Sequence, residues 1–149
     1  MLWLKGVGAI TLIITGALVG LRLSKNLELR RRKLNRFYVF IRELWGGIKI
    51  GEEIDSILDN SIDKNLIYRE GLSIKLNSDG LKGEDVKLLS EFLSLIGMGD
   101  TESQVLRCET YSELVKKRLD SAEHEVKEKA KLYSTLGFFS GLLVVILFV

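Results

Sequence analysis

The hydrophobic positions of the chain gather at its two ends, and the charged positions lie between them. Among residues 2–21 the only charged side chain is that of Lys5, and residues 133–149 have none. About 20 helical residues span about 30 Å, which is the thickness of the hydrocarbon core of a bilayer. The pattern therefore predicts a transmembrane helix over residues 2–21 and a second one over residues 133–149.

The first apolar stretch also fits a cleaved secretory signal, because Lys5 can serve as its basic start. However, no clear small-residue cleavage site precedes a polar segment, and a run of cations follows instead. These cations are Arg22, Lys25, Arg30, Arg31, Arg32, Lys33 and Arg36. Under the positive-inside rule, such a flank stays in the cytoplasm. We therefore favour an uncleaved span with its N-terminus across the membrane, with cleavage as the alternative.

The middle of the chain, residues 22–132, shows the three- and four-residue spacing of apolar side chains that is typical of amphipathic helices. One stripe predicts a helix that Gly46 and Gly47 interrupt or bend. This stripe consists of Leu27, Leu34, Phe37, Ile41, Leu44 and Ile48. A short second helix is predicted to end near Asn60, and a third to cover residues 84–96. The glycine-rich segment Arg69–Asp85 between them predicts a loop.

The last predicted helix begins at Thr101, which is expected to form a capping box with Gln104. No Gly or Pro interrupts the chain from there to Leu136, so one helix is expected to continue to the end. A long apolar stripe needs a partner helix, and the helix that leaves the first span is the natural one. We predict an all-α fold: a cytoplasmic antiparallel helical bundle over residues 22–132, flanked by an N-terminal and a C-terminal transmembrane helix.

The two long stripes also predict which residues meet inside the bundle. Val115, Leu119 and Ala122 of the last helix are expected to be buried against Phe37 and Ile41 of the first. The complete absence of proline, which breaks helices, favours the same all-helical fold.

Composition and motifs offer little for catalysis. The net charge of +2 is too small to indicate nucleic-acid binding, and the single cysteine excludes an internal disulfide. His124 lies among acidic residues on a charged helix face, and Cys108 lies on the apolar stripe. We find no nucleophile with a base, no metal-ligand spacing and no phosphate-binding motif. The sequence predicts a protein that is not an enzyme and that uses no cofactor, metal or small-molecule substrate.

Each predicted span contains a G-x-x-x-G motif, formed by Gly16 with Gly20 and by Gly137 with Gly141. Small residues at this spacing let helices approach closely in lipid, within one molecule or between copies. Glycine is also common in membrane spans without any such role. We therefore predict close helix packing at these four positions. The alternative is that these glycines have no packing role.

Two charged surfaces are candidates for binding a partner. One is the basic flank, defined by Arg30, Arg31, Arg32, Lys33 and Arg36; the other is the acidic turn, defined by Glu52, Glu53 and Asp55. The basic flank has a competing role as a membrane anchor, because each cation near an anionic leaflet contributes about 1 kcal/mol. We therefore predict that the acidic turn faces a cytoplasmic partner and that the basic flank faces the membrane.

Three stretches of this chain resemble the stage III sporulation protein AB family. They are "LGFFSGLLVVILFV" at the end, "IGMGDTESQ" before the long helix, and the glycine-containing first apolar stretch. The resemblance extends over the whole chain and is strongest at Ser134 to Val149, and at Gly97, Asp100, Ser103 and Gln104. It is weakest at Gly47 to Gly51, "GIKIG", where the acidic residue and the aromatic-glycine pair usual in the family are missing.

The resemblance implies a function that residue patterns do not. The family belongs to the channel apparatus that joins mother cell and forespore, and it is distantly similar to type II secretion inner-membrane platform proteins. It is expected in the mother-cell membrane around the forespore, where it links a stage III sporulation protein AA-type ATPase to other stage III sporulation channel proteins. Two alternatives remain: a membrane-anchored helical adaptor or receptor outside sporulation and, less favoured, a holin-like pore former.

Overall fold

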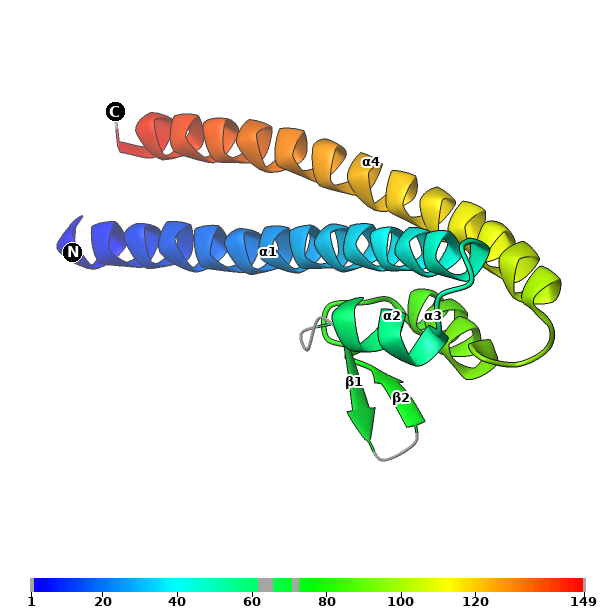
Figure 1. Cartoon of the computed structure of the whole chain (residues 1–149). Helices are drawn as coiled ribbons and strands as arrows, with labels where there is room; N and C mark the ends of the chain where they lie inside the picture. Colours follow the sequence, from blue (N-terminus) through cyan, green and yellow to red (C-terminus); the bar gives the residue numbers. More distant parts are fainter. Residues whose placement is uncertain (1, 62–65, 71–72, 149) are drawn as a thin grey trace. The chain divides into compact units, whose positions relative to one another are not determined.

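The structure is a computed structural model of the chain, and it describes the backbone of residues 2–61, 66–70 and 73–148. Side chains are described within residues 24–60, 66–70 and 73–129 and at positions 132 and 136. The elements, drawn in Figure 1, are α1 (Leu2–Lys49), α2 (Ile54–Ser61), β1 (Ile67–Glu70), β2 (Ser73–Leu76), α3 (Gly83–Leu95) and α4 (Thr101–Phe148).

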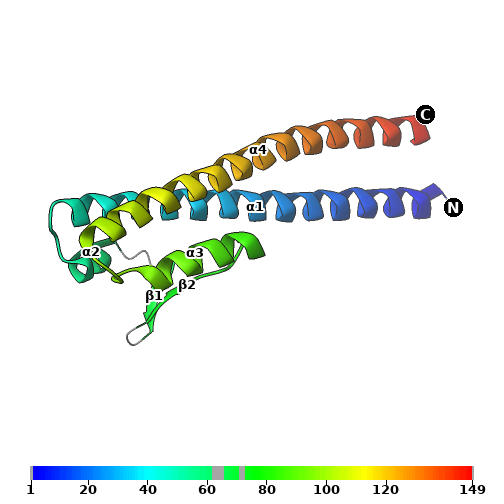
Figure 2. The same cartoon turned by 90° about the vertical axis from the view of Figure 1, so that its right-hand side faces the viewer.

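The chain forms two compact units, and the long helices α1 and α4 contribute to both. One unit consists of residues 1–28 and 123–149. Its two helical segments run antiparallel, as both views show (Figures 1 and 2). Within the described residues, no helix combines the length and hydropathy that a membrane span requires. Apart from Leu136, the side chains of the two predicted spans lie outside the described residues, and both spans therefore stay predictions.

The second unit, residues 29–122, holds the hydrophobic core. In this unit α2, α3 and the β1–β2 hairpin lie on one side of α1 (Figures 1 and 2). The predicted first stripe is confirmed from Leu34 to Ile48, because its side chains are at most 6% exposed there. Full burial of an aliphatic or aromatic side chain contributes about 1.5–3 kcal/mol. This stripe is therefore the surface of α1 on which the other elements pack.

The packing between the long helices is also confirmed. Val115, Leu119 and Ala122 are buried in the same core cluster as Phe37 and Ile41. A chain of aromatic contacts continues this core from α1 through α3 to α4. The ring centroids lie 5.9 Å apart for Phe37 and Phe92, and 5.2 Å apart for Phe92 and Tyr111.

The predicted loop over Arg69–Asp85 is wrong in its first part, where the chain forms a hairpin. Strand β1 pairs antiparallel with β2, and Ile67 lies opposite Leu76. The residues of β2 alternate between exposed Ser73 and Lys75 and half-buried Ile74 and Leu76. This period of two places one apolar face on the core, which outweighs the loop signal of the surrounding glycines. The fold is therefore mostly helical with a small sheet, and not all-α.

The predicted interruption at Gly46 and Gly47 is also wrong, because α1 continues to Lys49. The alternative, a bend at these glycines, stays a prediction. The helix ends in a Schellman motif: the N–H of Glu52 donates to the carbonyl of Gly47 at 3.0 Å, and the N–H of Gly51 donates to that of Ile48 at 3.1 Å. Gly51 has a φ of +81°, a conformation that glycine adopts without strain. The true stop signal is therefore Gly51, which follows the two glycines.

Helix α4 begins at Thr101, as predicted, but its N-cap is not Thr101. The hydroxyl and the backbone N–H of Ser103 donate to the carboxylate of Asp100, and these bonds lower the pKa of that carboxyl. Gln104 donates its side-chain amide to the carbonyl of Gly99 at 3.1 Å. Asp100 is therefore the N-cap, and Thr101 is the first helical residue.

Candidate partner-binding site

The basic flank does not form one exposed surface. Arg30 is only 3% exposed, and its Nε and Nη2 atoms donate to the two carboxylate oxygens of Asp85, at 2.6 Å and 3.2 Å. Asp85 is fully buried in the first turn of α3, where it also accepts the N–H of Lys82 at 3.2 Å. This two-point pair connects α1 with the start of α3. Arg30 therefore has a structural role that the sequence analysis missed.

Lys33 is the second buried member of the basic flank, at 6% exposure. Its Nζ atom donates to the backbone and side-chain oxygens of Asn77, each at 3.0 Å. Asn77 follows β2 directly, and its side-chain oxygen also accepts the N–H of Asp79. Lys33 thus holds the base of the hairpin on α1. The prediction that all five cations form an exposed surface is wrong for Arg30 and Lys33.

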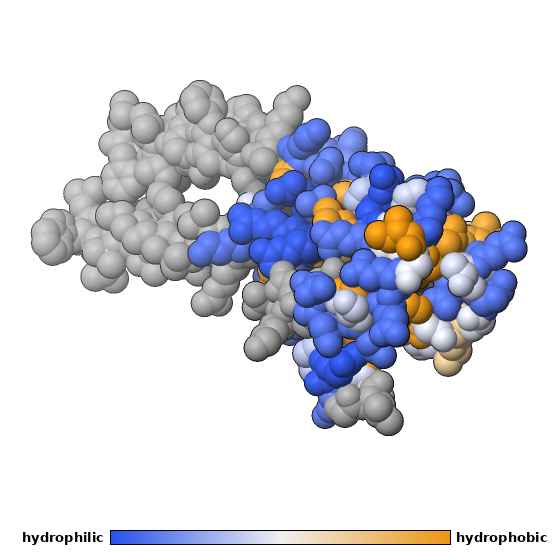
Figure 3. All heavy atoms as spheres, viewed as in Figure 1, coloured by the Kyte–Doolittle hydropathy of each residue, from blue (hydrophilic) through white to orange (hydrophobic). Residues whose placement is uncertain are grey.

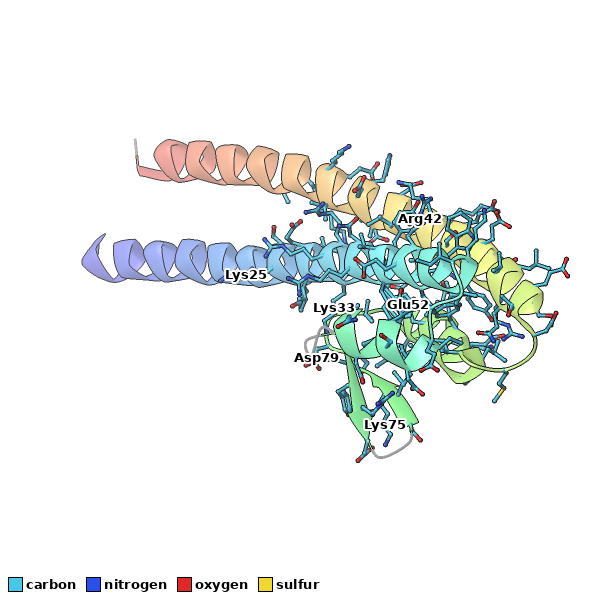
Figure 4. The ribbon with its side chains drawn as sticks, viewed as in Figure 1. Lys25, Lys33, Arg42, Glu52, Lys75 and Asp79 are labelled. Carbon is cyan, nitrogen blue, oxygen red and sulfur yellow. The ribbon has the colours of Figure 1, made fainter. Side chains whose placement is uncertain are left out.

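A groove of about 320 Å³ lies along part of the basic flank. Arg32, Lys33 and Arg36 line it from α1, and Asn77 and Asp79 line it from the segment after the hairpin. Figure 4 shows Lys33 and Asp79 on this side of the unit. The carboxylate of Asp79 partly offsets the positive charge. The contact of this flank with a membrane stays a prediction.

The acidic turn is exposed, as the sequence predicts for a partner face. Glu52 and Glu53 lie between α1 and α2, and Asp55 lies in the first turn of α2 (Figure 4 labels Glu52). Arg69 of β1 donates from Nη2 to Asp55 at 3.0 Å and from Nη1 to Asp59 at 3.3 Å. Exposed ion pairs of this kind contribute about 0–1 kcal/mol. The three carboxylates face solvent, and partner binding by the acidic turn stays a prediction.

The tertiary structure places a groove of about 500 Å³ next to the acidic turn, which we call the α2–hairpin groove. It is open to solvent and has a mixed lining. The lining residues are Glu53, Ile54, Asp55, Leu58, Arg69, Ile74, Ile96 and Gly97. On the face shown in Figure 3, the described surface is mostly hydrophilic, with apolar patches among the charged residues. Two of the three predicted partner residues therefore form part of a concave site.

The two candidate reactive side chains have ordinary roles. Cys108 is buried in the core, and burial raises the pKa of its thiol to about 11, so the thiol is neutral at physiological pH. His124 is exposed, with Nδ1 3.5 Å from a carboxylate oxygen of Glu128 one turn along α4. In the described part of the chain, no group of three or more His, Cys, Asp or Glu residues could hold a metal ion.

The G-x-x-x-G motifs at Gly16, Gly20, Gly137 and Gly141 lie where only the backbone is described. Their backbone is helical, as expected. Close packing at these positions stays a prediction.

Comparison with known proteins identifies a family. A sequence model of stage III sporulation protein AB matches residues 58–149, which include α3 and all of α4. The match is shorter than the expected whole-length resemblance, because residues 1–57 lie outside it. No curated protein and no solved structure matches the chain.

Proposed function

The chain belongs to the stage III sporulation protein AB family, and from this premise we propose that it is a membrane scaffold of the channel apparatus between mother cell and forespore. Membership implies a role in sporulation. The family match is the observation that carries the proposal, because it covers the whole of α4 with its apolar end. It also disfavours the alternative of an adaptor outside sporulation.

The proposed arrangement has two membrane spans, residues 2–21 and 133–149, with residues 22–132 on the cytoplasmic side. The hydropathy of both ends and the cations after the first end support it. In this arrangement residues 22–132, which carry both candidate binding surfaces, lie on the same side of the membrane as a cytoplasmic ATPase. The protein then contributes binding surfaces and no catalytic step of its own.

We propose the acidic turn as the site that binds the stage III sporulation protein AA-type ATPase. Its carboxylates are exposed, and charges on a binding rim accelerate association and select the partner. The basic flank is a weaker candidate, because Arg30 and Lys33 are committed to Asp85 and Asn77. The proposed contact with anionic lipid is assigned to the less buried cations of the flank, which are Arg31, Arg32 and Arg36.

Co-purification of the full-length chain with its cognate ATPase tests this proposal. The double variant Glu52→Lys/Glu53→Lys is expected to weaken binding about tenfold or more, most strongly at low salt, where exposed charges are least screened. A matched control, Glu102→Lys/Glu113→Lys, makes the same change in net charge at exposed positions of α4. It should bind like the wild type.

A second variant, Arg31→Ala/Arg32→Ala, distinguishes the two surfaces. Arg30 is left in place, because its loss would leave Asp85 buried without its cation. If the ATPase still binds the Glu52→Lys/Glu53→Lys protein but not the arginine variant, the acidic turn is the wrong surface. If neither variant affects binding, the ATPase contacts neither surface.

A further inference from the structure

The α2–hairpin groove combines an apolar floor with an acidic rim. Leu58 is buried at its base, and Ile54, Ile74 and Ile96 are half-buried around it. These side chains come from α2, from β2 and from the residue that follows α3. A volume of about 500 Å³ is within the range of sites that take a small ligand or a few side chains. The groove therefore fits a short segment of a partner.

The charges around the groove select the kind of segment. Glu53 and Asp55 line it, Asp59 is paired with Arg69, and Arg69 is the only cation among the described lining residues. Arg69 is already bound to Asp55 and Asp59. No ion pair of Glu53 is found among the described residues, and Lys75 on the neighbouring strand is paired with Glu70. The rim is therefore net negative and repels phosphate-rich ligands such as nucleic acids or anionic lipids.

We propose that the α2–hairpin groove binds a partner segment in which an apolar side chain is flanked by Lys or Arg. The apolar side chain covers the isoleucines, and the flanking cation approaches Glu53 and Asp55. Arg69 does not block this arrangement, because an exposed ion pair contributes little to stability and is easily exchanged. The inference rests on the proposed function only in taking the acidic turn as the partner-facing side.

The test measures binding of a synthetic peptide to the full-length chain in nonionic detergent. In this peptide, pairs of leucine residues alternate with pairs of lysine residues. In a Cys108→Ser background, Ile74→Cys places a thiol in the groove. Occupation of the groove is expected to slow maleimide labelling of this thiol about tenfold when the peptide is at about ten times its Kd. Ile96→Cys provides the same readout at a second lining position if Ile74→Cys impairs folding. Leu106→Cys is the control, because Leu106 lies on α4 outside the groove and is 63% exposed. The peptide should not change the labelling rate of this variant.

Charge variants test the selectivity of the groove. Glu53→Lys/Asp55→Lys should abolish protection by the peptide, whereas Glu102→Lys/Glu113→Lys should retain it. A peptide with glutamate in place of lysine should give no protection. Two results would overturn the proposal: equal protection of the Leu106→Cys protein, or protection that persists in the Glu53→Lys/Asp55→Lys variant. Either result would indicate non-specific or detergent-mediated binding.

Three further outcomes are informative. If the thiol becomes protected without peptide as protein concentration rises, a second copy of the chain occupies the groove and the proposal is wrong. If the peptide binds as expected but the ATPase does not, the groove inference stands and the proposed ATPase site fails. If the ATPase binds through Glu52 and Glu53 while no peptide protects the groove, the proposed function stands and this inference fails.

Discussion

Arg30 and Asp85 are 55 positions apart in the sequence, yet they form a buried pair with two hydrogen bonds. A buried ion pair is costly to desolvate, so its net contribution to stability is small, but loss of one partner is strongly destabilising. Asp85 also accepts the N–H of Lys82 at the start of α3. This one carboxylate therefore fixes the start of α3 and its position on α1.

We predict that Asp85→Asn lowers the free energy of unfolding of the full chain by about 3–5 kcal/mol, because the buried charge of Arg30 loses the counter-charge of Asp85. Urea unfolding followed by far-ultraviolet circular dichroism measures this loss. Asp79→Asn, an exposed change of the same chemistry, is the control. Equal stability of the two variants would mean that Arg30 reaches water in solution.

The Asp100 cap predicts a pH dependence. Hydrogen bonds from Ser103 lower the pKa of the Asp100 carboxyl from its ordinary value of 3.8. Because the folded pKa lies below the unfolded one, this stabilisation is fully present above the ordinary value and is lost as pH falls through the folded pKa. Asn also caps helices but does not titrate here. The Tm difference between wild type and Asp100→Asn should therefore narrow below pH 3.8. Parallel Tm curves would contradict the assigned cap.

At the scale of elements, α1 and α2 approach each other closely at one glycine. A Cβ atom added at Gly47 would lie 2.8 Å from Cγ1 of Ile57 and would also clash with its Cδ1, whereas nothing lies within 4 Å of one added at Gly46. Ile57 is buried, so it has little room to move. The two neighbouring glycines therefore have different roles, although the sequence shows them as a pair.

We predict that Gly46→Ala is neutral or stabilises by up to about 1 kcal/mol, because alanine is the better helix former. Gly47→Ala should destabilise the protein, because overpacking costs about 1–3 kcal/mol and outweighs the gain in helix propensity. Thermal unfolding of the two variants side by side measures the difference. If both variants were stabilised equally, α2 would not pack against Gly47.

At the scale of the whole molecule, the proposed topology places residues 22–132 in the cytoplasm. In a Cys108→Ser background, Ser78→Cys lies in the exposed segment after β2. A membrane-impermeant maleimide should label it only after the cells are permeabilised. Leu2→Cys, at the predicted outer end of the first span, should be labelled in intact cells. Ready labelling of the Ser78→Cys protein in intact cells would show that the topology is the reverse of the proposed one.

Local patterns predicted the helices because an amphipathic stripe follows from the helical repeat alone. The stripe from Leu34 to Ile48, the long helix from Thr101 and the roles of Cys108 and His124 were all accessible in this way. The same reasoning failed for residues 69–70 and 73–76, because short apolar alternations compete with strong glycine signals. It also failed for Gly46 and Gly47. A glycine within a helix and a glycine that ends a helix look the same in the sequence, and only their neighbours in space distinguish them.

Residue order and local spacing are enough to identify the family, the mostly helical fold and the acidic turn as a candidate surface. Which charges are buried depends instead on how the elements pack. Arg30 and Lys33 look like their neighbours in the basic flank, but they meet Asp85 and Asn77, which lie far along the chain. The α2–hairpin groove was likewise decided by folding, because its walls come from three separate elements and the segment after α3. Periodicity shows which face of an element is apolar, and the packed chain alone shows what that face meets.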